Sequence, residues 1–184
     1  MSEFTLNPPN LSTERLRLIP LSEDDLTERY RAWFDDLDVT RYLSTHAMTM
    51  DQLRESARRY LGSATALCYT IRLATTGQHI GNVTVNHVDY LTGMADSGVL
   101  IGERAAWRHG YALEAWRACL RYVLTDVGLR KIIAGAVDQH HASRRLMLKL
   151  GFRKEGVLRG ETWVEGRWCD VVRYGLFAQE IRRS

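Results

Sequence analysis

The segment Lys131–Val137 (KIIAGAV) constrains the fold most strongly, because its residues are apolar on both faces of an extended chain. A strand of this kind is typical of the centre of a sheet and favours a parallel neighbour. An amphipathic helical stripe runs before it from Gly110 to Val127, and Gly128 occupies the position of a helix C-cap glycine. A helix that leads into a central strand predicts a mixed α/β fold with one parallel crossover.

The rest of the chain predicts a mostly antiparallel sheet flanked by helices. Alternating apolar and polar residues, separated by short connections such as Thr75-Thr76-Gly77, predict a meander of antiparallel strands. Ser22 and the acidic residues after it form an N-cap that predicts a helix from 22 to about 34. The expected strands are 15–19, 68–73, 80–88 and 97–101, the other expected helices are 50–61 and 142–150, and a final hairpin turns at 165–166.

Composition limits the class of protein. A chain of 184 residues fits a single domain, 1–184, and 25 Lys and Arg against 22 Asp and Glu lack the basic excess of a nucleic-acid binder. The longest apolar stretch, 132–137, is far shorter than the roughly 20 residues that span a bilayer. The first residues show no secretory signal, and three well-separated cysteines favour a reducing cytoplasm. We therefore expect a cytoplasmic protein with neither a nucleic-acid nor a membrane partner.

The stretch from Gly98 to Ala115 carries the clearest chemical signal. A strand ends, a loop with Arg104, Arg108 and His109 follows, and a long helix begins near Gly110. Unpaired amides at a helix start and its partial positive charge attract anions, and a glycine lets a phosphate approach the backbone. The same residues also fit an ordinary basic loop. The G-x-x-x-x-G-K-[ST] and G-x-G-x-x-G motifs are absent, which disfavours P-loop kinases and nicotinamide enzymes.

Residues 107–112 (WRHGYA) resemble the acetyl-coenzyme A signature [QR]-x-x-G-x-[GA] of the GNAT superfamily of N-acetyltransferases, with Trp in the first position. The branch that acetylates ribosomal-protein N-terminal amines has W-G-x-G-Y-[AG]-x-E-A, from which Arg108 departs. Residues 143–152 (SRRLMLKLGF) resemble the S-x-x-x-x-x-K-L-G-F of that branch, and 13–18 resemble its first strand. The resemblance covers nearly the whole chain in matching order.

The resemblance implies where the coenzyme binds. Its diphosphate would rest on the loop and helix start at 107–112, and its pantetheine arm would pair with the strand at 99–101 like an added strand. A strand amide would also stabilise the oxyanion that forms at the thioester. His140 stands where many relatives have Asn and could bind the arm or titrate near neutrality. The implied cofactor-binding residues are Val99, Leu100, Ile101, Trp107, Arg108, His109, Gly110, Tyr111, Ala112, His140 and Ser143.

The resemblance also implies Ser143 as the catalytic acid that protonates the leaving thiolate, although a helix-start serine can equally bond its own backbone. Other branches use Tyr at the position of Met147, which cannot donate a proton. The general base stays open among Asp96, Asp170, His87 and Tyr69, or a water chain. The residues expected to line the acceptor pocket are Arg41, Tyr42, Leu43, Ser44, Glu161, Thr162 and Trp163.

The expected function is transfer of an acetyl group from acetyl-CoA to a primary amine by direct attack on the thioester. The acceptor would be a protein N-terminus or a small-molecule amine such as an amino sugar, and the protein a monomer or homodimer. The alternative is a non-catalytic acyl-CoA-binding regulatory module, which the departures at Arg108 and His140 favour. No metal is expected, since the adjacent His140 and His141 cannot easily face one ion and no cysteine lies nearby in sequence.

Overall fold

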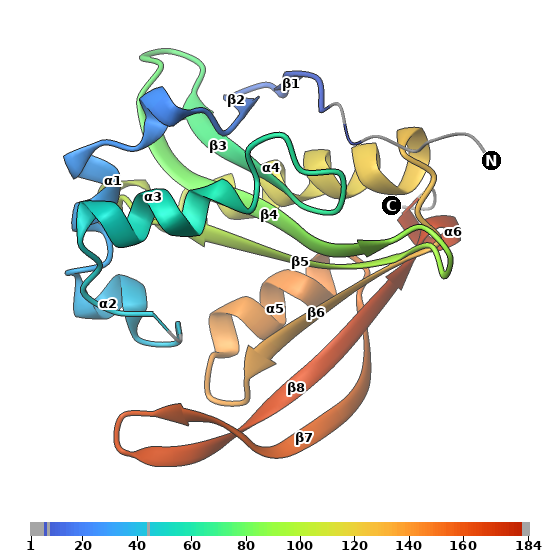
Figure 1. Cartoon of the computed structure of the whole chain (residues 1–184). Helices are drawn as coiled ribbons and strands as arrows, with labels where there is room; N and C mark the ends of the chain where they lie inside the picture. The colour runs from blue at the N-terminus through green and yellow to red at the C-terminus, as the bar shows by residue number, and fades with distance from the viewer. Residues whose placement is uncertain (1–5, 7, 44, 182–184) are drawn as a thin grey trace.

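Eight strands form one sheet in the order β1-β2-β3-β4-β5-β6-β8-β7 (Figure 1). The computed structural model describes residues 6, 8–43 and 45–181. The strands are β1 (Leu11–Ser12), β2 (Leu16–Pro20), β3 (Leu67–Leu73), β4 (His79–Asp89), β5 (Met94–Ile101), β6 (Lys131–Val137), β7 (Arg153–Val164) and β8 (Arg167–Phe177). The helices are α1 (Glu28–Ala32), α2 (Leu37–Thr40), α3 (Met50–Arg58), α4 (Tyr111–Arg121), α5 (His141–Lys149) and α6 (Ala178–Ile181), with short 3₁₀ turns η1 (Glu23–Asp25) and η2 (Arg104–Ala106) and a π turn η3 (Tyr122–Asp126).

The sheet confirms the mixed α/β fold expected from the sequence. β2, β3, β4 and β5 form an antiparallel meander, and β6 pairs parallel with β5 and antiparallel with β8. β6 is therefore central, as its apolar faces predict. The final hairpin turns at Glu165 and Gly166, both with positive φ (47° and 80°), as a tight two-residue hairpin turn requires.

Helices cover both faces of the sheet. Trp116 and Leu120 of α4 and Met147 of α5 share one buried cluster with Ile132 of β6. Ala57 of α3 packs instead in a second cluster with Leu21 and with Cys68 of β3. Cys68 alternates with Tyr69 of the first cluster, so the two clusters lie on opposite faces of the sheet.

The helix predicted from residue 22 to about 34 is wrong as a single element. Ser22 does begin a helical turn, but the Asp25 carboxylate accepts hydrogen bonds from the Ser22 amide (2.7 Å) and hydroxyl (2.9 Å) and closes that turn after η1. Leu26 then leaves the helical region (φ −81°, ψ 70°), and Thr27 caps a new helix by accepting from the Tyr30 amide. The capping residues of the sequence therefore mark two short helices here.

Candidate functional site

β5 and β6 part soon after they begin to pair. Only Met94–Asp96 of β5 pairs with Lys131–Ile133 of β6, whereas β5 stays paired with β4 up to Ile101 and β6 with β8 up to Val137. Figure 1 shows the two strands side by side at their starts and diverging toward the left of the view. Beyond Asp96, the edge of β5 that faces β6 has no strand partner in the described chain, so its main-chain groups are open to a ligand up to Leu100, whereas the Ile101 carbonyl already accepts a hydrogen bond from Trp107 Nε1.

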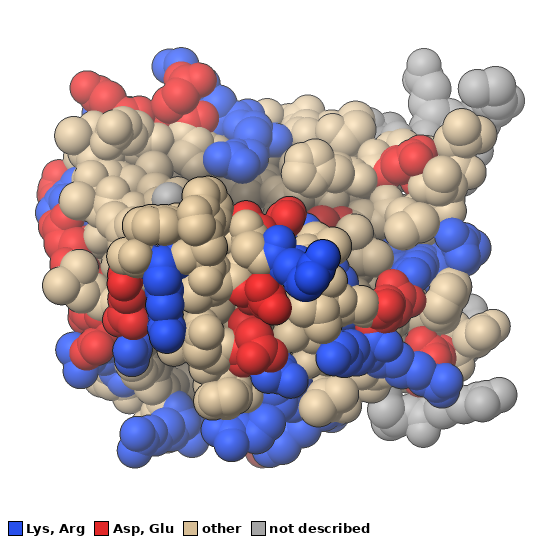
Figure 2. Space-filling view, turned by 90° about the horizontal axis from the view of Figure 1, so that it is seen from below, with Lys and Arg blue, Asp and Glu red and all other residues tan. Residues whose placement is uncertain are grey.

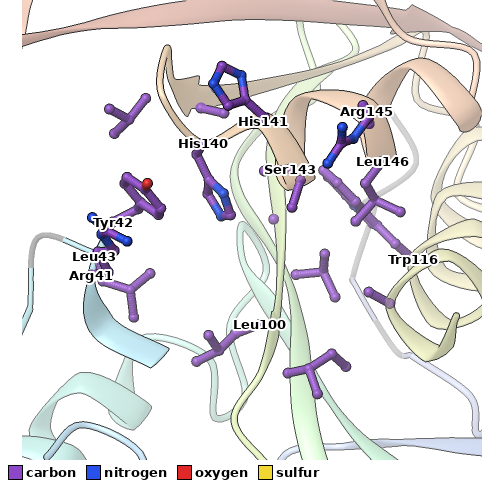
Figure 3. Close-up of a pocket in the computed structure, with 18 of the residues that line it drawn as sticks. Arg41, Tyr42, Leu43, Leu100, Trp116, His140, His141, Ser143, Arg145 and Leu146 are labelled. Atoms are coloured by element: carbon purple, nitrogen blue, oxygen red, sulfur yellow. The ribbon is translucent and has the colours of Figure 1, made fainter. Parts of the chain in front are cut away.

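A cavity of about 1220 Å³ occupies this split (Figure 3). Its walls come from β5, β6, the loop before α4 and the start of that helix, the start of α5, the segment after α2, and residues of β7 and β8. Of the eleven sequence-predicted cofactor-binding residues, ten line it: Val99, Leu100, Ile101, Trp107, Arg108, Gly110, Tyr111, Ala112, His140 and Ser143. His109 lies outside this lining, with its carbonyl accepting from Arg15 Nη1 (2.9 Å) and its ring stacked on Tyr111.

The loop before α4 has a left-handed backbone at two positions. Gly110 is the N-cap of α4 with φ 80°, and Arg108 has φ 66°. Such a conformation costs a non-glycine residue about 1–2 kcal/mol. A glycine at position 108, as in the branch that the sequence resembles, would carry no such cost. Arg108 adopts this left-handed conformation although it is not glycine, and its side chain adds a cation to the cavity wall.

The N-terminal strand region fixes the start of α4. The Glu114 carboxylate accepts from Thr13 Oγ1 (2.6 Å), the Arg15 amide (3.0 Å) and Arg15 Nε (2.7 Å). Burial alone would raise the pKa of Glu114, but these hydrogen bonds and the Arg15 charge outweigh it and lower that pKa. Since Arg15 also binds the His109 carbonyl, it holds both the loop and the first turn of α4.

Two tryptophans hold the end of β5 against this loop. Trp107 Nε1 donates to the Ile101 carbonyl (2.8 Å), which ties the loop to the last residue of the strand. A Cβ on Gly102 would lie 1.9 Å from Trp33 Cδ2, so the Trp33 ring packs directly on a bare backbone there. Glu103 accepts from Trp33 Nε1 (2.9 Å) and Arg29 Nε (2.7 Å), which anchors the region before α2 to the same loop.

Three cations on the cavity wall have no carboxylate partner among the described residues: Arg108, Arg145 and Lys149. Arg145 and Lys149 are functional candidates that the sequence reasoning missed. They are four residues apart on α5 and therefore share one helix face. Their four-residue spacing, within the segment 143–152 that resembles the acetyltransferase branch, is a sequence signal from which they could have been predicted.

Ser143 and His140 mark the start of α5 on the cavity wall (Figure 3). The Ser143 hydroxyl makes no hydrogen bond within the described part of the chain, so the helix-start explanation does not account for it. The His140 ring stacks on Tyr42 with a centroid distance of 4.3 Å. Burial, and then the neighbouring His141, lowers the pKa of His140 below its ordinary value, which favours the neutral ring.

Four of the seven residues expected at an acceptor pocket lie on the wall of this cavity. Arg41, Tyr42, Leu43 and Thr162 line the cavity, Glu161 and Trp163 do not, and Ser44 lies outside the described residues. Arg41 also forms an ion pair with Glu165 (3.0 Å), which joins the segment after α2 to the β7–β8 turn.

Among the four candidate bases, Asp96 lines the cavity. Tyr69 is fully buried in the core and donates to the Pro9 carbonyl (2.9 Å). Asp170 accepts from the Gly160 amide (2.9 Å), and both Asp170 and His87 lie outside the cavity lining.

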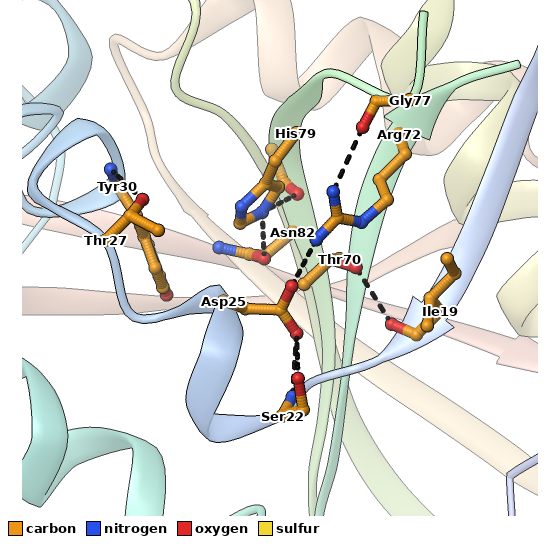
Figure 4. Close-up of polar contacts among 11 residues, drawn as sticks. Ile19, Ser22, Asp25, Thr27, Tyr30, Thr70, Arg72, Gly77, His79 and Asn82 are labelled. Carbon is orange, nitrogen blue, oxygen red and sulfur yellow. Dashed lines mark hydrogen bonds and ion pairs between the residues drawn. The ribbon is translucent and has the colours of Figure 1, made fainter.

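A smaller hollow of about 380 Å³ lies beside η1 and the β3–β4 turn. The buried Asp25 carboxylate forms an ion pair with Arg72 in addition to its bonds to Ser22 (Figure 4). His79 Nε2 lies 2.9 Å from Asn82 Oδ1 and 3.0 Å from the Gly81 carbonyl, and burial lowers the pKa of His79. Asp25, Arg72 and His79 therefore each have a polar partner within the chain.

The sequence matches the family of the acetyltransferase (GNAT) domain over residues 15–153. The chain belongs to the GNAT family. Members of this family are acetyl-CoA-dependent N-acetyltransferases, which gives the class of this enzyme. The uncharacterized N-acetyltransferase p20 of Bacillus licheniformis is 30% identical over 174 residues, covering 92% of this chain and 97% of the relative. The [ribosomal protein uS5]-alanine N-acetyltransferase of Escherichia coli is 31% identical over 80 residues, covering 43% of this chain and 40% of the relative.

Solved GNAT structures share the fold. The spermidine N-acetyltransferase of Vibrio cholerae, crystallised with CoA and spermine, superposes with a TM-score of 0.84 at 21% identity, covering 92% of this chain and 99% of that one.

None of the helices in the described part of the present chain has the length and apolarity needed to cross a bilayer. Its described residues also contain no cluster of three or more His, Cys, Asp or Glu side chains suited to a metal ion. Figure 2 shows acidic and basic side chains interspersed on the face seen from below.

Proposed function

We propose that this enzyme transfers an acetyl group from acetyl-CoA to a primary amine by direct attack of the amine on the thioester, within one acetyltransferase domain. The observation that carries the proposal is the parting of β5 from β6, which leaves one edge of β5 free beside a large cavity. An extended pantetheine arm fits such an edge because main-chain groups can pair with it as with a further strand.

The cavity wall suits the charged part of acetyl-CoA. The free amides at the start of α4 and the left-handed Gly110 leave the backbone open to a phosphate. Arg108, Arg145 and Lys149 add cations that no carboxylate of the described chain neutralises. Ion pairing with the coenzyme phosphates would give these side chains the partners they lack.

The reaction needs one bond formed, one broken and two protons moved. Acetyl-CoA supplies the activated acetyl group. The neutral amine nitrogen bonds to the carbonyl carbon as the carbon–sulfur bond breaks, and a main-chain amide of β5 stabilises the negative charge that develops on oxygen. Ser143 gives a proton to the departing sulfur and regains one from the amine or from solvent. An acceptor that binds as an ammonium ion must first give one proton to a base or to water, because only the neutral amine attacks.

Thiol release with acetyl-CoA and a panel of primary amines tests the proposal. We expect turnover with at least one amine and a fall in kcat of about 100-fold for Ser143→Ala. Ser143→Thr keeps a hydroxyl and should retain most of the rate, and acetyl-CoA affinity should be unchanged in both variants. Coenzyme binding without turnover over the whole panel would instead support the non-catalytic acyl-CoA-binding module. Wild-type rates in Ser143→Ala would remove Ser143 as the acid.

A further inference from the structure

Asp96 and Arg173 meet at the point where the two central strands part. Asp96 is the last residue of β5 that pairs with β6, and Arg173 of β8 pairs with Gly135 of β6. Arg173 Nη1 lies 3.5 Å from Asp96 Oδ2, and both residues line the cavity. Their side chains are 37% and 34% exposed, so the two charges are open to a ligand at the narrow end of the split.

Gly135 makes room for this pair. A Cβ at Gly135 would lie 3.1 Å from Arg173 Nη1 and 3.1 Å from Val171 Cγ1. Gly135 is not among the glycines with positive φ, so its backbone conformation does not require glycine. A side chain at Gly135 would instead crowd the Arg173 guanidinium, which lies over the bare backbone of β6.

The pair faces away from the proposed coenzyme-binding wall. Ser97, the residue after Asp96, accepts a hydrogen bond from Trp116 of α4 (2.8 Å) and so points toward the helix face of the sheet. Successive side chains of a strand point to opposite faces, which places Asp96 on the face away from α4. The cavity thus extends through the split in the sheet. On the face covered by α4 and α5 it has the cations without carboxylate partners, and on the opposite face it has Asp96 and Arg173.

Both members of the pair keep unused hydrogen-bonding capacity. A guanidinium has five N–H donors and a carboxylate has about four acceptor positions, and one 3.5 Å contact leaves most of them free. Burial raises the pKa of Asp96, while Arg173 and then His87 partly oppose that rise. Two other charged residues of the cavity wall are already engaged, Asp38 with Arg104 (2.7 Å) and Arg41 with Glu165 (3.0 Å).

We propose that Asp96 and Arg173 form the acceptor subsite and that the acceptor is a small α-amino acid with a free carboxylate. Asp96 binds the ammonium group and Arg173 binds the carboxylate. Adjacent opposite charges in the site match an α-amino acid, in which both groups are attached to one carbon. A polyamine offers Arg173 no anion, and a protein N-terminus has an amide where the carboxylate would be. This inference rests on the proposed acetyl transfer and names its substrate class.

Matched acceptors test the inference in the thiol-release assay. The probes are the twenty standard amino acids, their carboxamides, the decarboxylated amines, spermidine and alanine-initiated peptides. We expect the highest kcat/KM for a free amino acid, exceeding its own carboxamide and decarboxylated amine about tenfold or more, because neither of these two offers Arg173 a carboxylate. A carboxamide, amine, polyamine or peptide used as well as the best amino acid would overturn the inference and leave acetyl transfer standing. Absence of coenzyme binding, or of turnover with every amine, would overturn both.

Arg173→Met removes the charge and keeps much of the side-chain volume. We expect KM for the preferred amino acid to rise about tenfold or more, and kcat/KM for its carboxamide, which has no carboxylate for Arg173 to bind, to fall much less. Arg173→Lys should recover part of the loss. Arg167→Met is the matched control, since Arg167 is exposed on the same strand and lies outside the cavity lining. Unchanged acetyl-CoA affinity in Arg173→Met shows that the variant folds, and equal losses for acid and carboxamide would contradict the role of Arg173.

Discussion

The β5–β6 cavity and the smaller hollow beside η1 both contain arginine but differ in what neutralises it. In the smaller hollow, Arg72 pairs with the buried Asp25, and His79 is bonded to its neighbours. On the wall of the β5–β6 cavity, Arg145 and Lys149 have no carboxylate partner among the described residues. Charges that are paired within the chain hold the fold together, whereas cations left unpaired around a cavity are available to an anionic ligand.

The largest effect should come from breaking the paired hollow. Asp25→Ala leaves Arg72 without its anion and Ser22 without its acceptor, so we expect the free energy of unfolding to fall by about 3 kcal/mol. Asp24→Ala, at the exposed neighbouring residue, is the matched control and should change little. Urea denaturation measures both. A loss below about 1 kcal/mol in Asp25→Ala would show that the pair is not structural, and acetyl-CoA affinity of the folded protein should stay at the wild-type value.

The next effect concerns the start of α4. Gly110→Glu puts a carboxylate at the proposed phosphate site, and we expect acetyl-CoA affinity to fall about 100-fold or more through like-charge repulsion. Gly110→Ala imposes the same left-handed strain, about 1–2 kcal/mol, without the charge and should retain most of the affinity. Calorimetric titration compares them. Equal affinities for the two variants would place the phosphates elsewhere.

The smallest effect separates affinity from stability in the open cavity. Arg145→Gln and Lys149→Gln should each weaken acetyl-CoA binding about fivefold, since each removes one exposed ionic contact. Neither should change the free energy of unfolding by more than about 0.5 kcal/mol, because neither side chain has an internal partner to lose. Lys154→Gln, an exposed residue of β7 outside the cavity lining, is the control. If either variant lowered the free energy of unfolding and left acetyl-CoA affinity unchanged, these cations would be structural, as Arg72 is in the smaller hollow.

Local pattern predicted most of the elements but not how they combine. Each of these signals spans only a few residues. Examples are the apolar run of β6, the alternation of β3 and β4, and the glycines Gly110 and Gly128 at the two ends of the α4 region. The helix predicted from residue 22 failed because Asp25 turned back to bind Ser22 and Arg72, and only the second of these contacts is long-range.

The candidate site shows the same limit. The proposed coenzyme-binding wall was predicted mainly from one loop and one helix start, and the i, i+4 spacing of Arg145 and Lys149 could have extended it. The pairing of β5 with β6 ends after Asp96, and this end point is set by contacts between strands that are distant in sequence. The contact of Asp96 with Arg173 likewise joins two strands that are far apart in the chain. Neither feature leaves a trace in local periodicity.

The most direct test of the account is a crystal structure of the enzyme soaked with acetyl-CoA. We expect the diphosphate against the amides at the start of α4, with the pantetheine arm between β5 and β6 and paired to residues 99–101. A diphosphate bound at another place, or a split that stays empty at saturating acetyl-CoA, would contradict the account.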